Sequence, residues 1–293
     1  MAKRVVIFGS AGQLGVELVR EFSRKNYSVM GYDRATVDIT DSSAVEREIA
    51  AADPELVVNA AAYNQVDLAE QEPQAAFLVN ALAVRNIAVA CRQIDAPLVH
   101  FSTDYVFDGV AKRPYSEEDR PHPLGAYAVS KLAGELYARA YLDNALIIRT
   151  SGVFGPGGLH TARSNFVELM LRLYSAGGPI RVVADHIASP TYAPQLARCT
   201  VELAEGGHCG VFHVGGGTPI SWFDFAAMIF RAAGISDAPL RPTSEREYRT
   251  AARRPKYSAL KNARLEQLGM GSMPSIGAAL DMYFAARQAA ISS

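Results

Sequence analysis

A short apolar run that ends in a glycine cluster is the feature that most constrains this fold. Residues Val5–Phe8 are all apolar, and Gly9, Gly12 and Gly15 follow at intervals of three. Apolar residues then recur at helical spacing as far as Phe22. The pattern predicts a buried strand, a tight loop and a helix, an arrangement that binds the pyrophosphate of a dinucleotide. Because the usual spacing is G-x-G-x-x-G, an ordinary glycine turn is the alternative.

Similar apolar runs recur through the first half of the chain, at 28–31, 56–59, 98–101 and 146–148. Stretches with helical periodicity separate them, as at 73–94 and 124–142. Strands that are continuously apolar, rather than alternating, are buried on both faces. The sequence therefore predicts an α/β fold with a Rossmann-type, doubly wound parallel sheet covered by helices.

The rhythm changes beyond Arg149, where glycine-rich turns separate shorter elements. The length of 293 residues leaves room for roughly two domains. We predict an NAD(P)-binding Rossmann domain at 1–152 and a smaller carboxy-terminal α/β substrate lobe at 153–293. Residues from about 180 to 215 could return to the Rossmann sheet.

Composition excludes several classes of partner. Twenty-nine basic and thirty acidic side chains give a net charge of −1, which offers no field for nucleic acid or an anionic membrane. The first apolar run is too short for a signal peptide or a membrane span. Three cysteines and six histidines show no metal-ligand spacing, so we expect no metal in the reaction and a cytoplasmic protein without disulfides.

An acidic and a basic residue follow the second predicted strand, about twenty residues after the glycine loop. Asp33 would bind the adenosine ribose hydroxyls of NAD, whereas Arg34 would pair with the 2′-phosphate of NADP. The two cofactors thus stay open on these residues. Asp38 and Ile39 could lie at the edge of the adenine.

The most specific constellation is a tyrosine and a lysine four residues apart, Tyr127 and Lys131, on one face of a predicted helix. Ser102 and Thr103 precede them at the end of the fourth strand. A phenol with a pKa of about 10 is a poor proton donor and acceptor at neutral pH, and an adjacent cation would lower that pKa. Thr103 could then orient a substrate carbonyl.

A basic segment, 241–264, carries eight basic and two acidic residues. It could form a solvated helical face, or it could bind a diphosphate through guanidinium groups. Charge alone favours neither interpretation.

These motifs resemble the extended short-chain dehydrogenase/reductase family and, within it, the dTDP-4-dehydrorhamnose reductases. The resemblance covers most of the chain and is most specific at 102–109, Ser-Thr-Asp-Tyr-Val-Phe-Asp-Gly. Further matching segments are Gly12–Gly15, Val57–Tyr63, Val66–Glu70, Pro114–Glu117, Ser130–Glu135, Asn165–Val167, Pro190–Ala193 and Arg254–Pro255.

The resemblance implies a Rossmann lobe for the nicotinamide cofactor, a carboxy-terminal lobe for the nucleotide sugar, and Thr103, Tyr127 and Lys131 as catalytic residues. Hydride would pass to the keto carbon while Tyr127 protonates the alkoxide and Lys131 holds the nicotinamide ribose. The residues expected to bind the cofactor are Gly9, Gly12, Gln13, Leu14, Gly15, Asp33, Arg34, Asp38, Ile39, Ala60, Ala61, Ala62, Tyr63, Asn80, Ser102, Tyr127 and Lys131. Those expected to bind substrate are Asp104, Tyr105, Asn165, Arg253 and Arg254.

The chain departs from the family pattern at Gly152, where the family usually has an aromatic residue beside the sugar. Smaller departures are Asp185–Ala188, in place of Asp-Gln-x-Gly, and Ala128 after the catalytic tyrosine. We expect either Phe154, Tyr105 or another aromatic to restore the wall, or the pocket to admit a bulkier sugar; the first is favoured.

The expected function is NAD(P)H-dependent reduction of the 4-keto group of a nucleotide-linked 6-deoxy sugar, with dTDP-4-dehydro-L-rhamnose favoured as substrate and NADPH as cofactor. NADH is an alternative cofactor. There are two alternative functions. The protein could reduce another nucleotide sugar, or it could be a regulatory subunit that keeps the fold without turnover, as the methionine adenosyltransferase beta subunit does. A monomer and a homodimer are both open.

Overall fold

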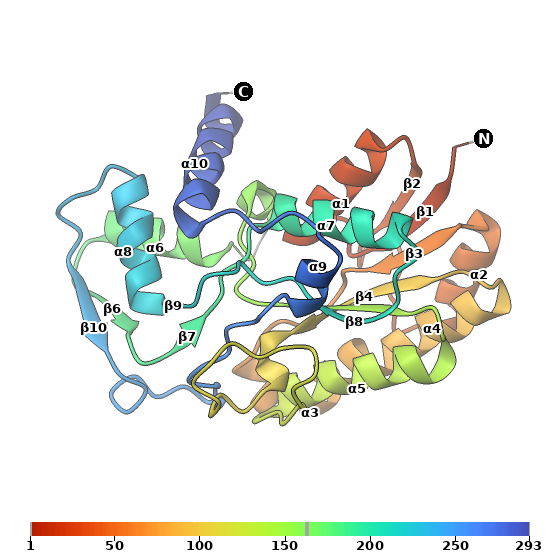
Figure 1. Cartoon of the computed structure of the whole chain (residues 1–293), viewed down its shortest axis with the longest axis horizontal. Coiled ribbons are helices and arrows are strands. Elements are labelled where there is room, and N and C mark those ends of the chain that lie inside the picture. The colour runs from red at the N-terminus through yellow and green to blue at the C-terminus, as the bar shows by residue number, and fades with distance from the viewer. Residues whose placement is uncertain (1, 162–163, 293) are drawn as a thin grey trace.

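A six-stranded, wholly parallel sheet organises the amino-terminal lobe of the computed structural model, which describes residues 2–161 and 164–292 (Figure 1). Its strand order is β2-β1-β3-β4-β5-β8, so the order reverses between β1 and β3. The strands are β1 (Arg4–Phe8), β2 (Ser28–Tyr32), β3 (Leu56–Asn59), β4 (Leu98–Thr103), β5 (Leu146–Thr150) and β8 (Gly210–His213). The predicted Rossmann-type sheet is confirmed.

Helices cover both faces of this sheet (Figure 1). Val5 and Ile7 of β1 pack toward α1 (Gln13–Arg24) and α7 (Ala193–Glu205). Val6 and Phe8 pack on the opposite face, against helices α2 (Ser42–Ala52), α4 (Ala83–Gln93) and α5 (Ala126–Tyr141). All four of these β1 side chains are fully buried, which explains why the strand is apolar at consecutive positions.

One continuous helical stretch, Pro73–Gln93, combines α3 (Pro73–Phe77), the π-helical turn η2 (Leu78–Leu82) and α4. By length and composition alone it could cross a membrane. Half of its most apolar window is buried inside the protein, however, as in the core helix of a soluble domain. The π turn packs against α5 and places Asn80 in the interior.

The carboxy-terminal lobe is built on two short ladders and an aromatic core. Strand β6 (Ile180–Val183) pairs in parallel with β10 (Leu240–Thr243), and β7 (Ile187–Ala188) pairs in antiparallel with β9 (Ile220–Ser221). Helices α6 (Phe166–Ala176), α8 (Trp222–Ala232) and α10 (Ile276–Ser292) complete the lobe. Its fully or nearly fully buried aromatic side chains are Phe154, Phe225, Phe230 and Tyr283.

The chain crosses between the lobes more than once. Helix α7 lies against α1, and β8 pairs with β5, so 193–213 belong to the Rossmann lobe. Strands β6 and β7, which fall inside the expected range of 180–215, belong to the carboxy-terminal lobe because their partners are β10 and β9. The short helix α9 (Ala263–Gln267) returns to β8.

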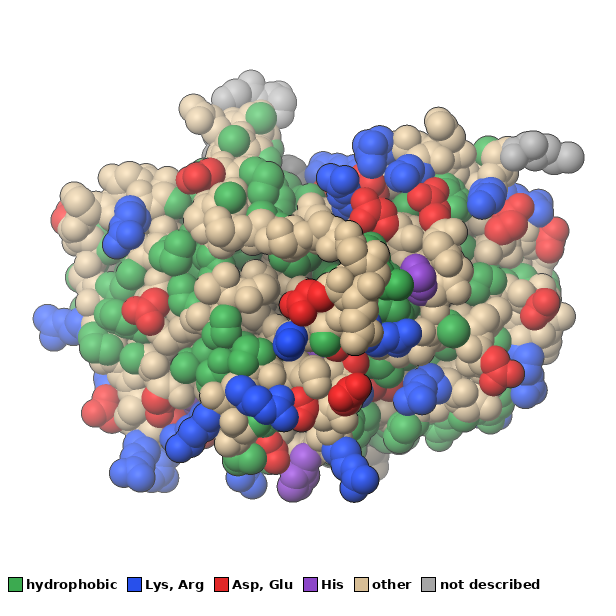
Figure 2. Space-filling view, viewed as in Figure 1, with side chains coloured by type: hydrophobic (Ala, Val, Ile, Leu, Met, Phe, Trp, Pro, Cys, Tyr) green, Lys and Arg blue, Asp and Glu red, His purple; other side chains and the backbone are tan. Residues whose placement is uncertain are grey.

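Charged side chains of both signs are interspersed over the face shown in Figure 2. Basic groups do not form a separate stripe on that face. This distribution agrees with the near-neutral net charge of the chain.

Candidate active site

A cavity of about 750 Å³ lies beyond the carboxyl ends of β1, β2 and β3. This is where the strand order reverses, the position at which open α/β sheets bind their ligands. The predicted cofactor residues that line it are Gly9, Gly12, Asp33, Arg34, Asp38, Ile39, Ala60, Ala61, Ala62 and Tyr63. Ten residues predicted from separate sequence segments therefore share one cleft.

The three glycines of the first loop have different functions. Gly9 has φ +78°, and a Cβ there would lie 2.5 Å from the backbone nitrogen of Ala61. A Cβ on Gly15 would lie 2.0 Å from the Gly9 carbonyl oxygen, so Gly15 permits close packing of loop and helix. Gly12 caps α1 without a side-chain hydrogen bond and faces the cavity. The first N–H groups of α1 are thus available to an anion such as a pyrophosphate.

The segment after β2 is a rigid turn at the rim of the cavity. Asp33 Oδ1 accepts hydrogen bonds from the Ala35 and Thr36 N–H groups at 3.0 and 2.9 Å. Together with the Thr36 hydroxyl, which contributes most, they hold the pKa of Asp33 below its usual value. The pKa of Asp38 is lowered in the same way, chiefly by Thr40 and to a smaller extent by the exposed Arg34.

Sequence reasoning missed half of the cavity lining. The additional residues are Ala11, Ala35, Val37, Thr40, Asn64, Gln65, Glu72, Ala75, Leu78 and Val79. Several belong to the helical stretch that starts at Pro73, where Leu78 remains 43% exposed. The exposure of Leu78 is visible only in the structure, so the apolar pattern of this stretch gave no signal for this wall of the cavity.

The three predicted catalytic residues come together at the carboxyl end of β4. Thr103 ends that strand, and Tyr127 and Lys131 lie on α5. The Tyr127 hydroxyl lies close to the Thr103 side chain and donates to Oδ1 of Asn64, a residue of the cleft lining, at 3.5 Å. Lys131 Nζ donates to the Phe101 carbonyl oxygen at 2.6 Å. Tyr105 meets Tyr127 edge to face, with ring centroids 6.2 Å apart.

The expected effect of Lys131 on the Tyr127 phenol is wrong for this arrangement. Burial raises the pKa of Tyr127, and the neighbouring Asp104 and Tyr105 raise it further, whereas the nearby Thr103 side chain lowers it. Lys131 points to the Phe101 carbonyl instead of the phenol. Burial lowers the pKa of Lys131 itself to about 8, against the opposing effect of Glu135.

A buried ionic network lies behind β4. The Ser102 hydroxyl donates to Glu135 Oε1 at 2.5 Å, and Arg149 forms a bidentate pair with the Glu135 carboxylate at 2.9 and 2.7 Å. All three residues are less than 5% exposed. The Ser102 side chain therefore contacts this network and does not line the cofactor cavity.

Asn80 acts through the loop that lines the cavity. Its amide accepts from the Tyr63 N–H at 2.8 Å and donates to the Tyr63 carbonyl at 3.0 Å. The same amide donates to Ser130 of α5. Gly134 makes this packing possible, because a Cβ there would lie 2.2 Å from the Asn80 carbonyl oxygen.

Asp104, predicted to face the sugar, is instead buried and surrounded by hydroxyl groups. Its Oδ2 accepts from Ser151 at 2.8 Å and from Ser258 at 2.5 Å, and its Oδ1 accepts from Thr103 at 3.2 Å. Burial raises the pKa of Asp104 to about 6, although these hydrogen bonds oppose the shift. Asp104 thus contacts Thr103, the threonine predicted to be catalytic, from behind.

Asn165 likewise makes protein contacts. Its side-chain oxygen caps α6 by accepting from the Glu168 N–H, and its nitrogen donates to Gln13 Oε1 at 2.9 Å. The Gln13 amide in turn donates to the Val153 carbonyl. Asn165 and Gln13 therefore join the two lobes beside the glycine loop. Leu14, its neighbour, packs against the apolar core.

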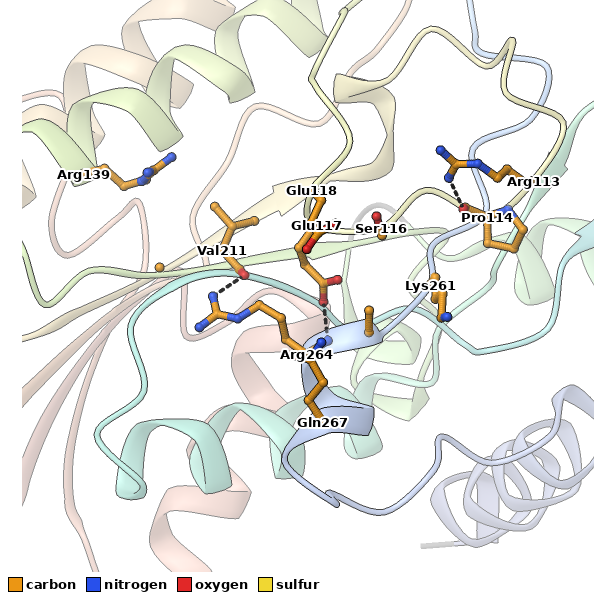
Figure 3. A pocket seen from close by; sticks show the side chains of 12 residues that line it. Arg113, Pro114, Ser116, Glu117, Glu118, Arg139, Val211, Lys261, Arg264 and Gln267 are labelled. Atoms are coloured by element: carbon orange, nitrogen blue, oxygen red, sulfur yellow. Dashed lines mark hydrogen bonds between the residues drawn. The ribbon is translucent and has the colours of Figure 1, made fainter.

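The basic segment 241–264 does not form one anion site. Arg254 forms a bidentate pair with Asp67 at 3.0 and 2.7 Å and also contacts the Tyr105 phenol, whereas Arg253 is exposed. Arg264 lines a second cavity, of about 860 Å³ (Figure 3). Its guanidinium group donates to the Val211 carbonyl, and its backbone N–H donates to the Glu117 carboxylate.

Asp185, His186 and Glu245 form a cluster whose potential metal-ligand atoms lie within 4.8 Å of one another. Lys256 Nζ lies 3.6 Å from Asp185 and 3.5 Å from Glu245. The cluster therefore has a cation of its own, and we assign no metal chemistry to it.

Comparison with known proteins assigns this chain to a sequence family. The sequence family described as the RmlD substrate binding domain matches residues 3–288. The chain belongs to this family. The resemblance inferred from the motifs is thus confirmed. Individual relatives also match almost the whole of this chain.

Two relatives and one solved structure are similar to most of this chain. The spore coat polysaccharide biosynthesis protein SpsK of Bacillus subtilis is 38% identical, over 91% of this chain and 92% of its own. The dTDP-4-dehydrorhamnose reductase of Mycolicibacterium smegmatis is 39% identical, over 92% of this chain and 81% of its own. A crystal structure of the dTDP-4-dehydrorhamnose reductase of Bacillus anthracis, in complex with NADP, is 37% identical and superposes with a TM-score of 0.92, covering 97% of this chain and 99% of that one.

Proposed function

We propose that this RmlD-family protein is an NADPH-dependent reductase of dTDP-4-dehydro-L-rhamnose that yields dTDP-L-rhamnose. The observation that carries the proposal is the assembly of Thr103, Tyr127 and Lys131 beside a cleft with the features of a dinucleotide site. The names of the relatives and the NADP complex of the Bacillus anthracis enzyme support the same activity and cofactor.

The residues of the cleft fit a dinucleotide. The pyrophosphate would lie over Gly12 at the uncapped amino end of α1, and Asp33 and Arg34 would bind the adenosine ribose and a 2′-phosphate. The bound nicotinamide would supply a hydride to the keto carbon of the sugar. Asn80 holds the Ala60–Tyr63 loop that forms one wall of the cleft.

Proton transfer falls to the tyrosine. Thr103 and Tyr127, whose side chains lie close together, would hold the substrate carbonyl oxygen between their hydroxyl groups. As negative charge develops on that oxygen, Tyr127 donates its proton to it. The raised pKa of Tyr127 keeps the phenol protonated before the reaction.

Lys131 would bind the nicotinamide ribose and help return a proton to Tyr127. Its ammonium group lies on the same helix face, and its pKa of about 8 makes proton exchange accessible near neutral pH. Arg254 or Arg253 would contact the diphosphate of the nucleotide sugar, and Tyr105 would contact the sugar. A cytoplasmic location, a monomer or homodimer, and the absence of nucleic-acid, membrane and metal partners belong to the proposal.

The decisive experiment measures NADPH oxidation with a panel of dTDP-, UDP- and GDP-linked 4-keto sugars. We expect turnover of dTDP-4-dehydrorhamnose, a loss of at least about a hundredfold in kcat for Tyr127→Phe, and unchanged NADPH affinity. Tyr137→Phe, on the same helix, is the matched control and should retain activity. NADPH binding by the native protein without turnover of any sugar would favour the regulatory function instead.

A further inference from the structure

The side chain that precedes Gly152 is linked to Thr103 through the Asp104 carboxylate. Ser151 donates to Asp104 at 2.8 Å, and the same carboxylate accepts from Thr103. Gly152 therefore follows directly on a residue that shares the Asp104 carboxylate with Thr103. If Thr103 holds the substrate carbonyl as proposed, a side chain that covers Gly152 would lie on the sugar side of that group.

Trp222 supplies that side chain. Its Cη2 atom lies 3.0 Å from the position that a Cβ of Gly152 would occupy, and the Pro190 Cα lies at 3.3 Å. Gly152 has φ +50°, a conformation that residues with a Cβ rarely adopt. Phe154 is fully buried in the aromatic core and is not available for this position. Glycine at 152 is thus what allows the indole to approach the backbone.

The indole is held by well-ordered contacts. Ser221 caps α8 by accepting from the Asp224 N–H, and the backbone N–H of Trp222 donates to the His186 carbonyl at 3.2 Å. The ring packs edge to face on Phe166, with centroids 4.7 Å apart, and remains only partly buried. A side chain fixed at its backbone and on one edge, yet partly exposed, can present a flat surface to a ligand.

We infer that Trp222 is a specificity-determining residue that forms the aromatic wall beside the sugar, in place of a side chain at position 152. This inference rests on the proposed function, because it places the sugar next to Thr103. A flat indole favours the C–H face and the methyl group of a 6-deoxy sugar over rings with additional hydroxyl groups. The wall thus comes from α8 of the carboxy-terminal lobe and not from the loop after β5.

The native protein offers a direct test, because Trp222 is its single tryptophan. We expect titration with dTDP-L-rhamnose, without cofactor and with excitation at 295 nm, to change the emission intensity or maximum saturably. Titration with dTDP alone, which lacks the sugar, should change it much less. Equal changes with the two ligands, or saturable binding by calorimetry without an emission change, would overturn the inference.

Substitutions provide a second, independent test. Trp222→Ala should raise the KM for the nucleotide sugar about three- to tenfold and leave the NADPH dissociation constant unchanged. Trp222→Phe should show a smaller rise in this KM. It also provides a milder substitution in case the alanine variant does not fold. Phe223→Leu, at the next position of α8, is the matched control. Unchanged KM in both folded Trp222 variants would exclude a role in the site.

Exchanging the two positions separates this inference from the proposed function. Gly152→Trp alone should lose nucleotide-sugar affinity, because its side chain would collide with Trp222. The double variant Gly152→Trp/Trp222→Gly should recover part of that loss. The double variant could fail to recover affinity for the nucleotide sugar while the native protein turns over and Tyr127→Phe is inactive. That outcome would support the reductase function and contradict the role of Trp222 as the aromatic wall. Inactivity of the native protein would count against the function alone, since the emission test needs no turnover.

Discussion

The two lobes are stabilised by different kinds of interaction. In the Rossmann lobe, strands such as β1 and β3 are buried on both faces, and each pairs with its neighbours in a continuous ladder. In the carboxy-terminal lobe, the ladders join only two strands each, and the core consists of aromatic side chains. The first lobe is thus stabilised mainly by its sheet, and the second by side chains that are distant in sequence.

Polar ties from the second lobe reach the loops that carry the site. Asn165 binds Gln13 beside the glycine loop, Arg254 binds Asp67, and Ser258 binds Asp104. Each tie spans more than 150 residues of sequence. The Rossmann lobe therefore carries the residues proposed to be catalytic, while the other lobe fixes their surroundings.

The largest expected effect concerns the buried pair of Glu135 and Arg149. Glu135→Leu leaves a buried guanidinium without its partner and should lower the free energy of unfolding by about 3–5 kcal/mol, measured by urea denaturation. The double variant Glu135→Leu/Arg149→Leu should recover most of the loss. Arg287→Leu, which breaks the partly exposed pair with Glu168 in the other lobe, should cost only about 1 kcal/mol. Equal losses of unfolding free energy for Glu135→Leu and Arg287→Leu would contradict this difference between the two lobes.

The second prediction concerns pH and the Asp104 tie. Because the folded-state pKa of Asp104 is raised to about 6, the folded protein favours the protonated form. The resulting stabilisation is complete below the unfolded-state pKa and is lost as pH rises through about 6. Between pH 4.5 and 7, the free energy of unfolding of the native protein should fall by about 2 kcal/mol relative to Asp104→Asn. Parallel pH profiles of the two proteins would refute the burial of an ionisable Asp104.

The third prediction distinguishes the two neighbouring arginines. Arg254→Ala should raise the dissociation constant of the nucleotide sugar about tenfold in calorimetry, since a charge-assisted contact is lost. The pairing with Asp67 limits the effect, because part of the Arg254 charge is already neutralised. Arg253→Ala, at an exposed position, is the control and should change little. NADPH affinity should stay constant in both, and equal losses of sugar affinity would remove the special role of Arg254.

The smallest expected effect concerns cofactor choice within the Rossmann lobe. Arg34→Ala should weaken NADPH about fivefold and leave NADH unchanged, because the exposed guanidinium pairs only with the 2′-phosphate. Fluorescence titration of both cofactors measures the difference. Arg47→Ala, on the exposed face of α2, is the control. Equal weakening of NADPH and NADH would show that Arg34 does not read the phosphate.

Local patterns were sufficient to predict the sheet and the dinucleotide cleft. The apolar runs correspond to β1 to β5, because burial on two faces leaves a clear signal in consecutive residues. Side chains alternate along β4, so Ser102 and Thr103 point to opposite faces of the strand, and only Ser102 enters the buried network with Glu135. That difference could have been predicted, since neighbouring strand residues cannot share a face.

The surroundings of the site could not be predicted, because they depend on distant partners. Nothing near Asp104 in the sequence indicates that Ser151 and Ser258 will enclose its carboxylate. Similarly, Gly152 and Trp222 meet only because α8 begins beside the loop after β5. A family pattern marks the missing aromatic residue, but only the tertiary structure identifies its replacement.

The tie between Asp104 and Ser258 also has a consequence for synthesis on the ribosome. The two residues are 154 positions apart, so the second is added about 8–30 s after the first at ordinary rates of translation. Once β8 ends at His213, the nascent chain contains every strand of the sheet, whereas Asp104 still lacks Ser258, one of its three hydroxyl partners. The 45 residues from His213 to Ser258 take about 2–9 s to add, so the dinucleotide cleft can form a few seconds before Thr103 is fully supported.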